Sequence, residues 1–167
     1  MAGGQLGSRG TGELNVTVLA VGKTSGPEAE LTARYLERAQ KAGRQMGISR
    51  VSMREIPDQA GPRRADLEAA MLLSRRGGGV LIALDERGAG WSSADFARYL
   101  RQWADLSADC SFAVGGADGH GEELRRAADV TVSLGAITLP HLLARAVLCE
   151  QIYRAVTLCI GHPYHRA

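Results

Sequence analysis

The sequence predicts an α/β fold in which a mostly parallel sheet is flanked by helices, and three observations lead to it. Short apolar segments rich in β-branched residues alternate with longer segments whose apolar residues recur at helical spacing. This alternation continues from residue 14 to residue 160 without an internal sequence repeat. Glycines follow several of the short segments, as is typical where a strand gives way to a loop. Regular alternation of strand and helix indicates an open parallel sheet.

The size and composition of the chain favour one domain. Its 167 residues, 45% of them hydrophobic and 23% charged, suffice for one core and are too few for two comfortable domains. Residues 1–13 are rich in glycine and are expected to form a disordered extension, so the single domain covers residues 14–167. No apolar run approaches the roughly 18 residues of a membrane span, and the N-terminal residues lack the apolar stretch of a signal peptide. We therefore expect a cytoplasmic protein with no membrane partner.

Basic residues are concentrated in one part of the chain, although the formal net charge is only +2. Between residues 33 and 64 there are eight Arg or Lys side chains and three acidic ones. Such a segment can face phosphates, or it can be an ordinary solvated surface in a sequence that favours arginine. Charge alone leaves both interpretations open.

The first half of the chain contains two predicted strands and two predicted helices. The first strand is Leu14–Val21, which ends at a glycine, and the second is 50–56. Between them a helix begins near Ser25 with Pro27 in its first turn. Its apolar positions are Leu31, Tyr35, Ala39, Ala42 and Met46. A loop at 58–64 leads to a helix at 65–75, which a triple glycine ends.

The second half of the chain repeats the pattern three times. Strands are predicted at 80–84, Cys110–Val114 and 130–134, with a loop at 85–91 after the first of them. Ser92, followed three residues later by Asp95, predicts the start of a helix that buries Phe96, Leu100 and Trp103. A short helix is expected at 122–128 and a long one at 142–160. The core candidates of the long helix are Leu143, Val147, Tyr153, Val156 and Ile160.

Three of the predicted strands are followed by loops that could form a ligand pocket. The sequences are LDERGAG at 84–90, VGGADGHG at 114–121 and LGAITLP at 134–140. Ligands of open α/β sheets bind beyond the carboxyl ends of the strands, and glycines let the backbone approach them closely. Main-chain groups could bind a flat polar molecule while Ile137 and Leu139 sandwich its ring. The alternative is that the glycines only end the strands and turn the chain.

Common nucleotide-binding motifs do not fit. The segment VGKT at 21–24 lacks the glycine that a P-loop has five residues before Gly22, because Thr17 stands there. No G-x-G-x-x-G follows a predicted strand, which argues against an ordinary dinucleotide site.

An ordered set of motifs resembles the RlmH family, SPOUT-class methyltransferases of large-subunit ribosomal RNA. The motifs are AVGK, LDERG, SS-x-DFA, VGG-x-DG, LPH before a long helix, and a terminal HPYHR, and the similarity covers residues 14–167. The resemblance implies that the C-terminal part of the sheet is tied into a trefoil knot and that the enzyme is a homodimer. It also implies S-adenosyl-L-methionine as cofactor. The expected cofactor-binding residues are Leu84, Gly115, Gly116, Gly135, Ala136, Ile137, Thr138, Leu139 and Pro140.

The resemblance also gives the unusual C-terminal segment GHPYHRA a role. RlmH enzymes methylate N3 of a pseudouridine in large-subunit ribosomal RNA on the assembled ribosome, and the corresponding tail lies near the methyl donor, across the dimer interface. His165 and Tyr164 are the expected catalytic residues, since loss of the N3 proton suits a group that titrates near neutrality. His165 is the candidate base or proton shuttle, while Tyr164 could stack on the base or hydrogen-bond to it. Much of the rate could instead come from holding the methyl group in line with the nitrogen.

The expected RNA-binding residues are Arg166, His141, Arg154, Arg63 and Arg64. Two of them have plainer interpretations. His141 could orient its own loop, and Arg154 could, like Arg145, form an exposed ion pair with Glu150 on the long helix. His141, His162 and His165 lack acidic or thiolate companions at suitable spacing, so no metal site is expected.

The chain departs from the family pattern in two loops. It has DQAGPRRAD where the family commonly has a lysine-rich loop, and Asp118 where glutamate is common. Arg63 and Arg64 retain positive charge in the first loop. A non-catalytic RNA-binding or ribosome-assembly module with the same fold is the alternative function.

Overall fold

The computed structural model describes residues 13–166, and the expected extension at residues 1–13 lies, apart from Glu13, outside the described residues. Strands and helices alternate along this range, with two short 3-10 helices at Arg44–Met46 and Pro163–Arg166. The strands are β1 (Leu14–Val21), β2 (Ile48–Ile56), β3 (Val80–Gly90), β4 (Cys110–Val114) and β5 (Val130–Ser133). The helices are α1 (Gly26–Gly43), α2 (Arg64–Arg75), α3 (Ser93–Asp105), α4 (Glu122–Ala127) and α5 (His141–Ile160).

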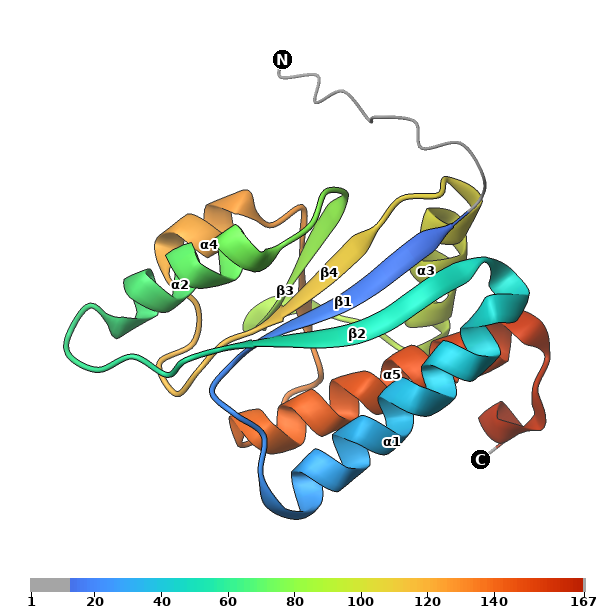
Figure 1. Cartoon of the computed structure of the whole chain (residues 1–167), viewed down its shortest axis with the longest axis horizontal. Helices are drawn as coiled ribbons and strands as arrows, with labels where there is room; N and C mark the ends of the chain where they lie inside the picture. The colour runs from blue at the N-terminus through green and yellow to red at the C-terminus, as the bar shows by residue number, and fades with distance from the viewer. Residues whose placement is uncertain (1–12, 167) are drawn as a thin grey trace.

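The five strands form one parallel sheet in the order β2-β1-β4-β3-β5 (Figure 1). Parallel strands require crossover connections, and the helices supply them. Because all strands run in one direction, their carboxyl ends share one edge of the sheet, where the loops following β3, β4 and β5 meet. The α/β class and the parallel sheet are therefore confirmed.

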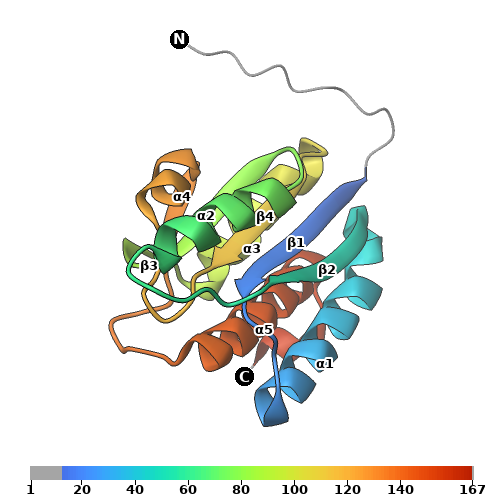
Figure 2. The ribbon, with the colours of Figure 1, turned by 60° about the vertical axis from the view of Figure 1, so that its left-hand side comes forward.

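Helices cover both faces of the sheet, which explains the nearly continuous burial of β1 and β4. The helices α1, α3 and α5 pack on one face, and α2 and α4 pack on the other (Figures 1 and 2). Side chains of β1 alternate between the two cores, so that Val18 faces the first core and Leu19 the second. In the described part of the chain no helix is both long and apolar enough to cross a membrane.

The start of α3 follows the predicted pattern closely. The main-chain N–H of Asp95 donates to Oγ of Ser92 at 3.1 Å, and the N–H of Ser92 donates back to the Asp95 carboxylate at 2.9 Å. This reciprocal capping satisfies two main-chain donors at the helix start. Phe96, Leu100 and Trp103 are buried below it, as expected.

Several details differ from the expectations. The predicted loop at 85–91 is wrong as far as Gly90, because β3 continues to that residue after an irregularity in its pairing with β5. Leu143 is 37% exposed and is not a core residue, and Leu31 of α1 is 36% exposed. Arg145, expected in exposed ion pairs, is fully buried.

Candidate active site

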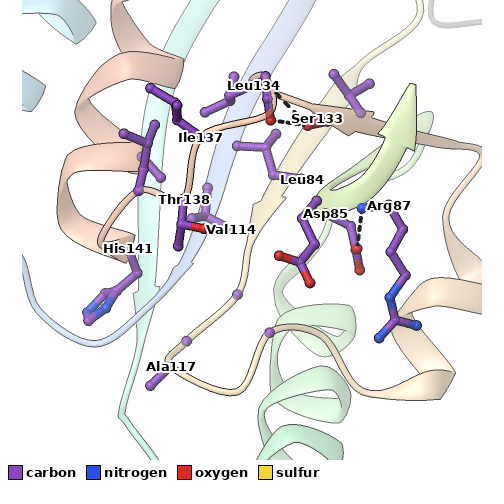
Figure 3. A pocket seen from close by; sticks show the side chains of 18 of the residues that line it. Leu84, Asp85, Arg87, Val114, Ala117, Ser133, Leu134, Ile137, Thr138 and His141 are labelled. Carbon is purple, nitrogen blue, oxygen red and sulfur yellow. Dashed lines mark hydrogen bonds between the residues drawn. The ribbon is translucent and has the colours of Figure 1, made fainter. Parts of the chain in front are cut away.

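A cavity of about 560 Å³ opens at the carboxyl ends of β3, β4 and β5, beside the first turn of α5 (Figure 3). This volume lies within the range of small-molecule sites. Eight of the nine residues expected to bind the cofactor line it: Leu84, Gly115, Gly116, Gly135, Ala136, Ile137, Thr138 and Leu139. Pro140 does not line it and instead stands at the N-cap of α5. The structure therefore brings together three loops that are far apart in the sequence.

The glycine loop, residues 115–121, forms one wall of the cavity. A tight turn closes it, in which the N–H of Gly119 donates to the carbonyl of Gly116 at 3.0 Å and Gly119 has a φ of +72°. A Cβ atom on Gly115 would come within 2.9 Å of the Gly119 carbonyl carbon. Only glycine therefore fits at position 115 without a shift of the backbone.

The loop after β5 forms the opposite wall. It begins with Ser133, whose Oγ donates to the carbonyl of Gly135 at 2.9 Å. Gly135 has a φ of +129°, a conformation that disfavours any other residue. Beyond it the chain is exposed, and Ile137 presents 76% of its surface to solvent. In Figure 3, Ile137, Thr138 and His141 lie on one side of the hollow, and Asp85 and Arg87 on the other.

The irregular part of β3 turns charged side chains toward the cavity. Leu84 and Ala89 both pair with Val132, so the residues between them bulge out of the ladder. A Cβ on Gly88 would come within 2.6 Å of the Val132 main-chain nitrogen, so a glycine is needed where β5 passes. Asp85, Glu86 and Arg87, which the sequence did not single out, thereby line the cavity.

Asp85 is the most constrained of these charged groups. Its carboxylate accepts a hydrogen bond from the Arg87 main-chain N–H at 3.0 Å and pairs with Nε of Arg125 at 3.0 Å. Burial by itself raises the pKa of Asp85, but these hydrogen bonds and the charge of Arg125 outweigh it, so the pKa lies below its usual value. Asp85 is therefore ionised at this wall, and its charge is neutralised by the Arg125 guanidinium, which also lines the cavity.

His120 is a buried residue that the sequence analysis missed. It is 4% exposed, and its Nε2 lies 3.1 Å from the carbonyl oxygen of Ala113 in β4. Burial lowers the pKa of His120, which favours the neutral ring. The ring therefore anchors the end of the glycine loop to β4, and His120 does not line the cavity.

The C-terminal tail folds back on the second half of α5. The hydroxyl of Tyr164 donates to Oε1 of Glu150 at 3.0 Å, and the Arg154 guanidinium, paired with Glu150 at 2.8 Å, lies 5.0 Å from the centre of the Tyr164 ring. Burial, together with hydrogen bonds to Tyr35 and Glu150, raises the pKa of Tyr164. The tail is thus held in a defined position.

The other residues expected to act in catalysis or RNA binding near the tail are His165, Arg166 and, on α5, Arg154. Nδ1 of His165 is buried and has no hydrogen-bond partner within residues 13–166, while Arg166 is exposed. Arg154 has only 20% of its side chain exposed, because Glu150 and Tyr164 occupy its guanidinium.

The tail and the cavity of one chain lie at opposite ends of α5 (Figure 1). His141 and Ala144, in the first turn of α5, line the cavity, whereas the tail follows the last turn. The tail folds back as far as Glu150, which is nine residues beyond His141 and thus about 14 Å along the helix, and the cavity lining includes neither Tyr164 nor His165. The structure therefore does not bring His165 or Tyr164 to the cavity of its own chain.

The expected basic residues have different environments. Arg64 pairs with Asp118 of the glycine loop, whereas the side chain of Arg63 is 81% exposed. Arg145 donates to the carbonyl of Val21 at 2.7 Å and pairs with Glu55 at 2.9 Å. The buried guanidinium is stabilised there because backbone acceptors and a carboxylate meet its Nη donors, while its Nε has no partner in the described part of the chain.

No group of three or more His, Cys, Asp or Glu residues that could hold a metal ion occurs among the residues that the structure describes. The chain was next compared with models of known protein families. The family model described as "Predicted SPOUT methyltransferase" matches residues 14–165. The chain belongs to the SPOUT methyltransferase family. The resemblance seen in the sequence is thereby confirmed.

Curated relatives and solved structures agree with this membership. The Ribosomal RNA large subunit methyltransferase H of Bradyrhizobium diazoefficiens is 45% identical over 160 residues, covering 92% of this chain and 100% of the relative. The protein of the same name from Paracoccus denitrificans is 42% identical over 154 residues, covering 92% and 99%. A solved structure described as a probable methylase family protein from Haemophilus influenzae Rd KW20 has a TM-score of 0.51 at 11% identity, covering 89% of this chain and 69% of that one. At this identity the solved structure shows a shared fold alone.

Proposed function

We propose that the protein transfers a methyl group from S-adenosyl-L-methionine to N3 of a pseudouridine in large-subunit ribosomal RNA, acting on the assembled ribosome in the cytoplasm. Membership of the SPOUT methyltransferase family and the names of relatives at 42–46% identity support this activity. The observation that carries the proposal is the cavity, which gathers eight of the nine residues expected to bind the cofactor.

The cavity fits the proposed cofactor by its chemistry as well as by its size. An adenine ring needs apolar side chains and main-chain hydrogen bonds, and Leu84, Val114 and Leu134 stand beside two loops with exposed backbone. When bound, S-adenosyl-L-methionine supplies an electrophilic methyl group.

We further propose that the loops after β4 and β5 belong to a trefoil knot. The loop after β5 and the glycine loop form facing walls of the cavity, and α5 follows directly. A knotted crossing would hold these walls together without large side chains between them, which suits a pocket built from glycines and backbone.

The working enzyme in this proposal is a homodimer in which the tail of one protomer completes the cavity of its partner. Tyr164 contacts α5 at Glu150, about 14 Å along the helix from His141 at the cavity, and neither Tyr164 nor His165 lines the cavity of its own chain. Apolar side chains that a partner could cover are exposed near the cavity and on the adjoining helices: Ile137, Leu143 and Leu31. With two-fold symmetry, the tail of each protomer would complete the cavity of the other.

In the composite site His165 accepts the N3 proton of the base. Tyr164, held by Glu150, orients the base. His141 at the cavity, together with the exposed Arg166 and Arg63, contacts RNA phosphates.

Arg154 contributes to RNA binding through the tail that it holds. Its guanidinium is occupied by Glu150 and by the Tyr164 ring, so it positions the tail against the substrate. Neutralising this side chain would therefore loosen Tyr164 as well as remove a charge.

Mixing two defective variants tests the proposal. Gly115→Val damages the cavity and deletion of residues 164–167 removes the tail, so neither homodimer should methylate ribosomes. After subunit exchange, half of the dimers carry one intact cavity facing one intact tail, and activity should recover to roughly one quarter of the wild-type value. Exchanged dimers that stay inactive, although each variant is folded, would contradict a site shared between protomers.

A further inference from the structure

The first turn of α2 contacts the glycine loop at three points. Arg64 pairs with Asp118, the carbonyl of Ala65 lies against Gly121, and the carboxylate of Glu68 lies against Gly116. This part of α2 includes the end of the segment 58–66, where the family commonly has a lysine-rich loop, so it connects an expected RNA-facing segment with a wall of the cavity.

Two of these contacts are close and buried. A Cβ on Gly121 would come within 2.6 Å of the Ala65 carbonyl oxygen, so the two backbones touch there. Glu68 is 2% exposed, and one of its oxygens accepts from the Gln59 main-chain N–H at 3.0 Å. Its other oxygen would lie 2.9 Å from a Cβ on Gly116. Substitutions at these points would disturb packing and therefore test folding as much as function.

The third contact is a paired hydrogen bond at the surface and can be changed separately. Nε and Nη2 of Arg64 donate to the two carboxylate oxygens of Asp118 at 2.5 and 2.7 Å. The pairing lowers the pKa of Asp118 and raises that of Arg64. Bidentate pairing fixes orientation as well as distance. Arg63, its neighbour in the sequence, has only a 4.0 Å contact with Asp66 and is far more exposed.

The sequence gives these two adjacent arginines the same role, and the structure separates them. This inference rests on the proposed function. We propose that Arg64 is a positioning residue for the cofactor: through Asp118 it holds the glycine loop in its binding conformation. Of the two arginines, only Arg63 binds the RNA.

The physical reason lies in the composition of the loop. Four of the seven residues from 115 to 121 are glycines, so the loop loses much conformational freedom when it is ordered around a ligand. Asp118 lies inside the turn between Gly116 and Gly119. Its ion pair with Arg64 lets α2 restrain this turn of the glycine loop. If the loop is already restrained before binding, less conformational entropy is lost when the ligand binds, and the affinity is higher.

Calorimetry with S-adenosyl-L-methionine on the full-length protein tests this division. Arg64→Gln should weaken cofactor binding by about 2- to 5-fold, the range expected for one exposed ion pair. Arg64→Asp, which faces Asp118 with a like charge, should weaken it further. Arg63→Gln is the matched control and should leave cofactor affinity unchanged while weakening RNA binding and reducing its salt dependence.

Exchanging the two charges shows whether Arg64 acts through its pair with Asp118 or whether substitutions at position 64 disturb the structure in general. Arg64→Asp combined with Asp118→Arg restores the pair in reverse, so cofactor affinity should return toward the wild-type value, while RNA binding, which depends on Arg63, should not change. Equal cofactor affinities for wild type, Arg64→Gln and Arg64→Asp would overturn the inference, as would a swap that rescues nothing in a folded protein.

Hydrogen exchange of the ligand-free protein gives a second readout. Amides of residues 115–121 should exchange faster in Arg64→Gln than in Arg63→Gln or wild type. Wild-type protein that binds no S-adenosyl-L-methionine would overturn the proposed function, and the exchange comparison would still decide the role of Arg64. Identical exchange in all three proteins would contradict the restraint.

Discussion

Gly115→Val tests the cavity at the point where its wall is tightest. A Cβ at position 115 would lie 2.9 Å from the carbonyl carbon of Gly119, 3.0 Å from its oxygen and 3.2 Å from its Cα. These are backbone atoms, which cannot rotate away as the end of a side chain can. Overpacking of this kind costs about 1–3 kcal/mol. If the cost falls on the binding conformation of the loop, cofactor affinity drops by about 5- to 150-fold.

Calorimetry with S-adenosyl-L-methionine measures this loss, and thermal unfolding checks that the variant is folded. Gly115→Ala carries the same Cβ and should already weaken binding. Gly78→Val is the matched control, because Gly78 is exposed and a Cβ there meets no atom within 4 Å. A folded Gly115→Val protein with wild-type affinity would refute the placement of the cofactor against the glycine loop.

Four further outcomes are expected. Thr138→Pro should abolish cofactor binding in calorimetry, because it removes a main-chain N–H and stiffens a wall of the cavity; unchanged affinity would contradict that. Deleting residues 164–167 should leave cofactor binding nearly intact and remove turnover, and a parallel loss of both would show that the tail supports its own chain's cavity. His165→Ala should slow single-turnover methylation by roughly 10²-fold and alter its pH profile if the imidazole is the base; an unchanged rate and profile would exclude that role. Arg145→Met should lower the free energy of unfolding in urea by about 3 kcal/mol, because it removes the charge that pairs with Glu55 and the donor to the Val21 carbonyl; a change below 1 kcal/mol would contradict this.

The sequence predicted the strands well where apolar residues crowd together, and it failed where a distant segment decides the structure. β1 and β4 have the predicted bounds, because strands buried on both faces read as continuous apolar runs. The end of β3 reads as a loop, since its charges and glycines are typical of one. It is a strand because β5 pairs with it past the bulge, and a pairing partner in another part of the chain leaves no local signal.

Helix α5 shows the same limit for side chains. Apolar residues stand on nearly all its sides, so periodicity could not identify Leu143 as exposed. Arg145 looked like a member of a surface ion-pair series, yet it is buried because the end of β1 presents carbonyl groups to it.

In the candidate site, too, some features could be predicted from the sequence and others could not. The glycine-rich loops mark the cavity correctly, because backbone that approaches a ligand needs glycine and because parallel strands end at one edge. Asp85 and the role of Asp118 could not be read from the sequence, since each depends on a partner 40 or more residues away. His120 was missed because its burial depends on how the glycine loop packs against β4. The distance between tail and cavity also required the structure, because it depends on the course of α5.

The central claim is that this chain methylates a ribosomal pseudouridine, and one measurement tests it most directly. Assembled ribosomes that carry the unmethylated pseudouridine are incubated with wild-type protein and isotope-labelled S-adenosyl-L-methionine, and nucleosides of the large-subunit RNA are analysed by mass spectrometry. We predict labelled N3-methylpseudouridine, formed by wild type and absent with the tail-deleted protein. Ribosomes that gain no labelled pseudouridine from a folded, cofactor-binding protein, or that gain the label on another nucleoside, would contradict the proposed activity.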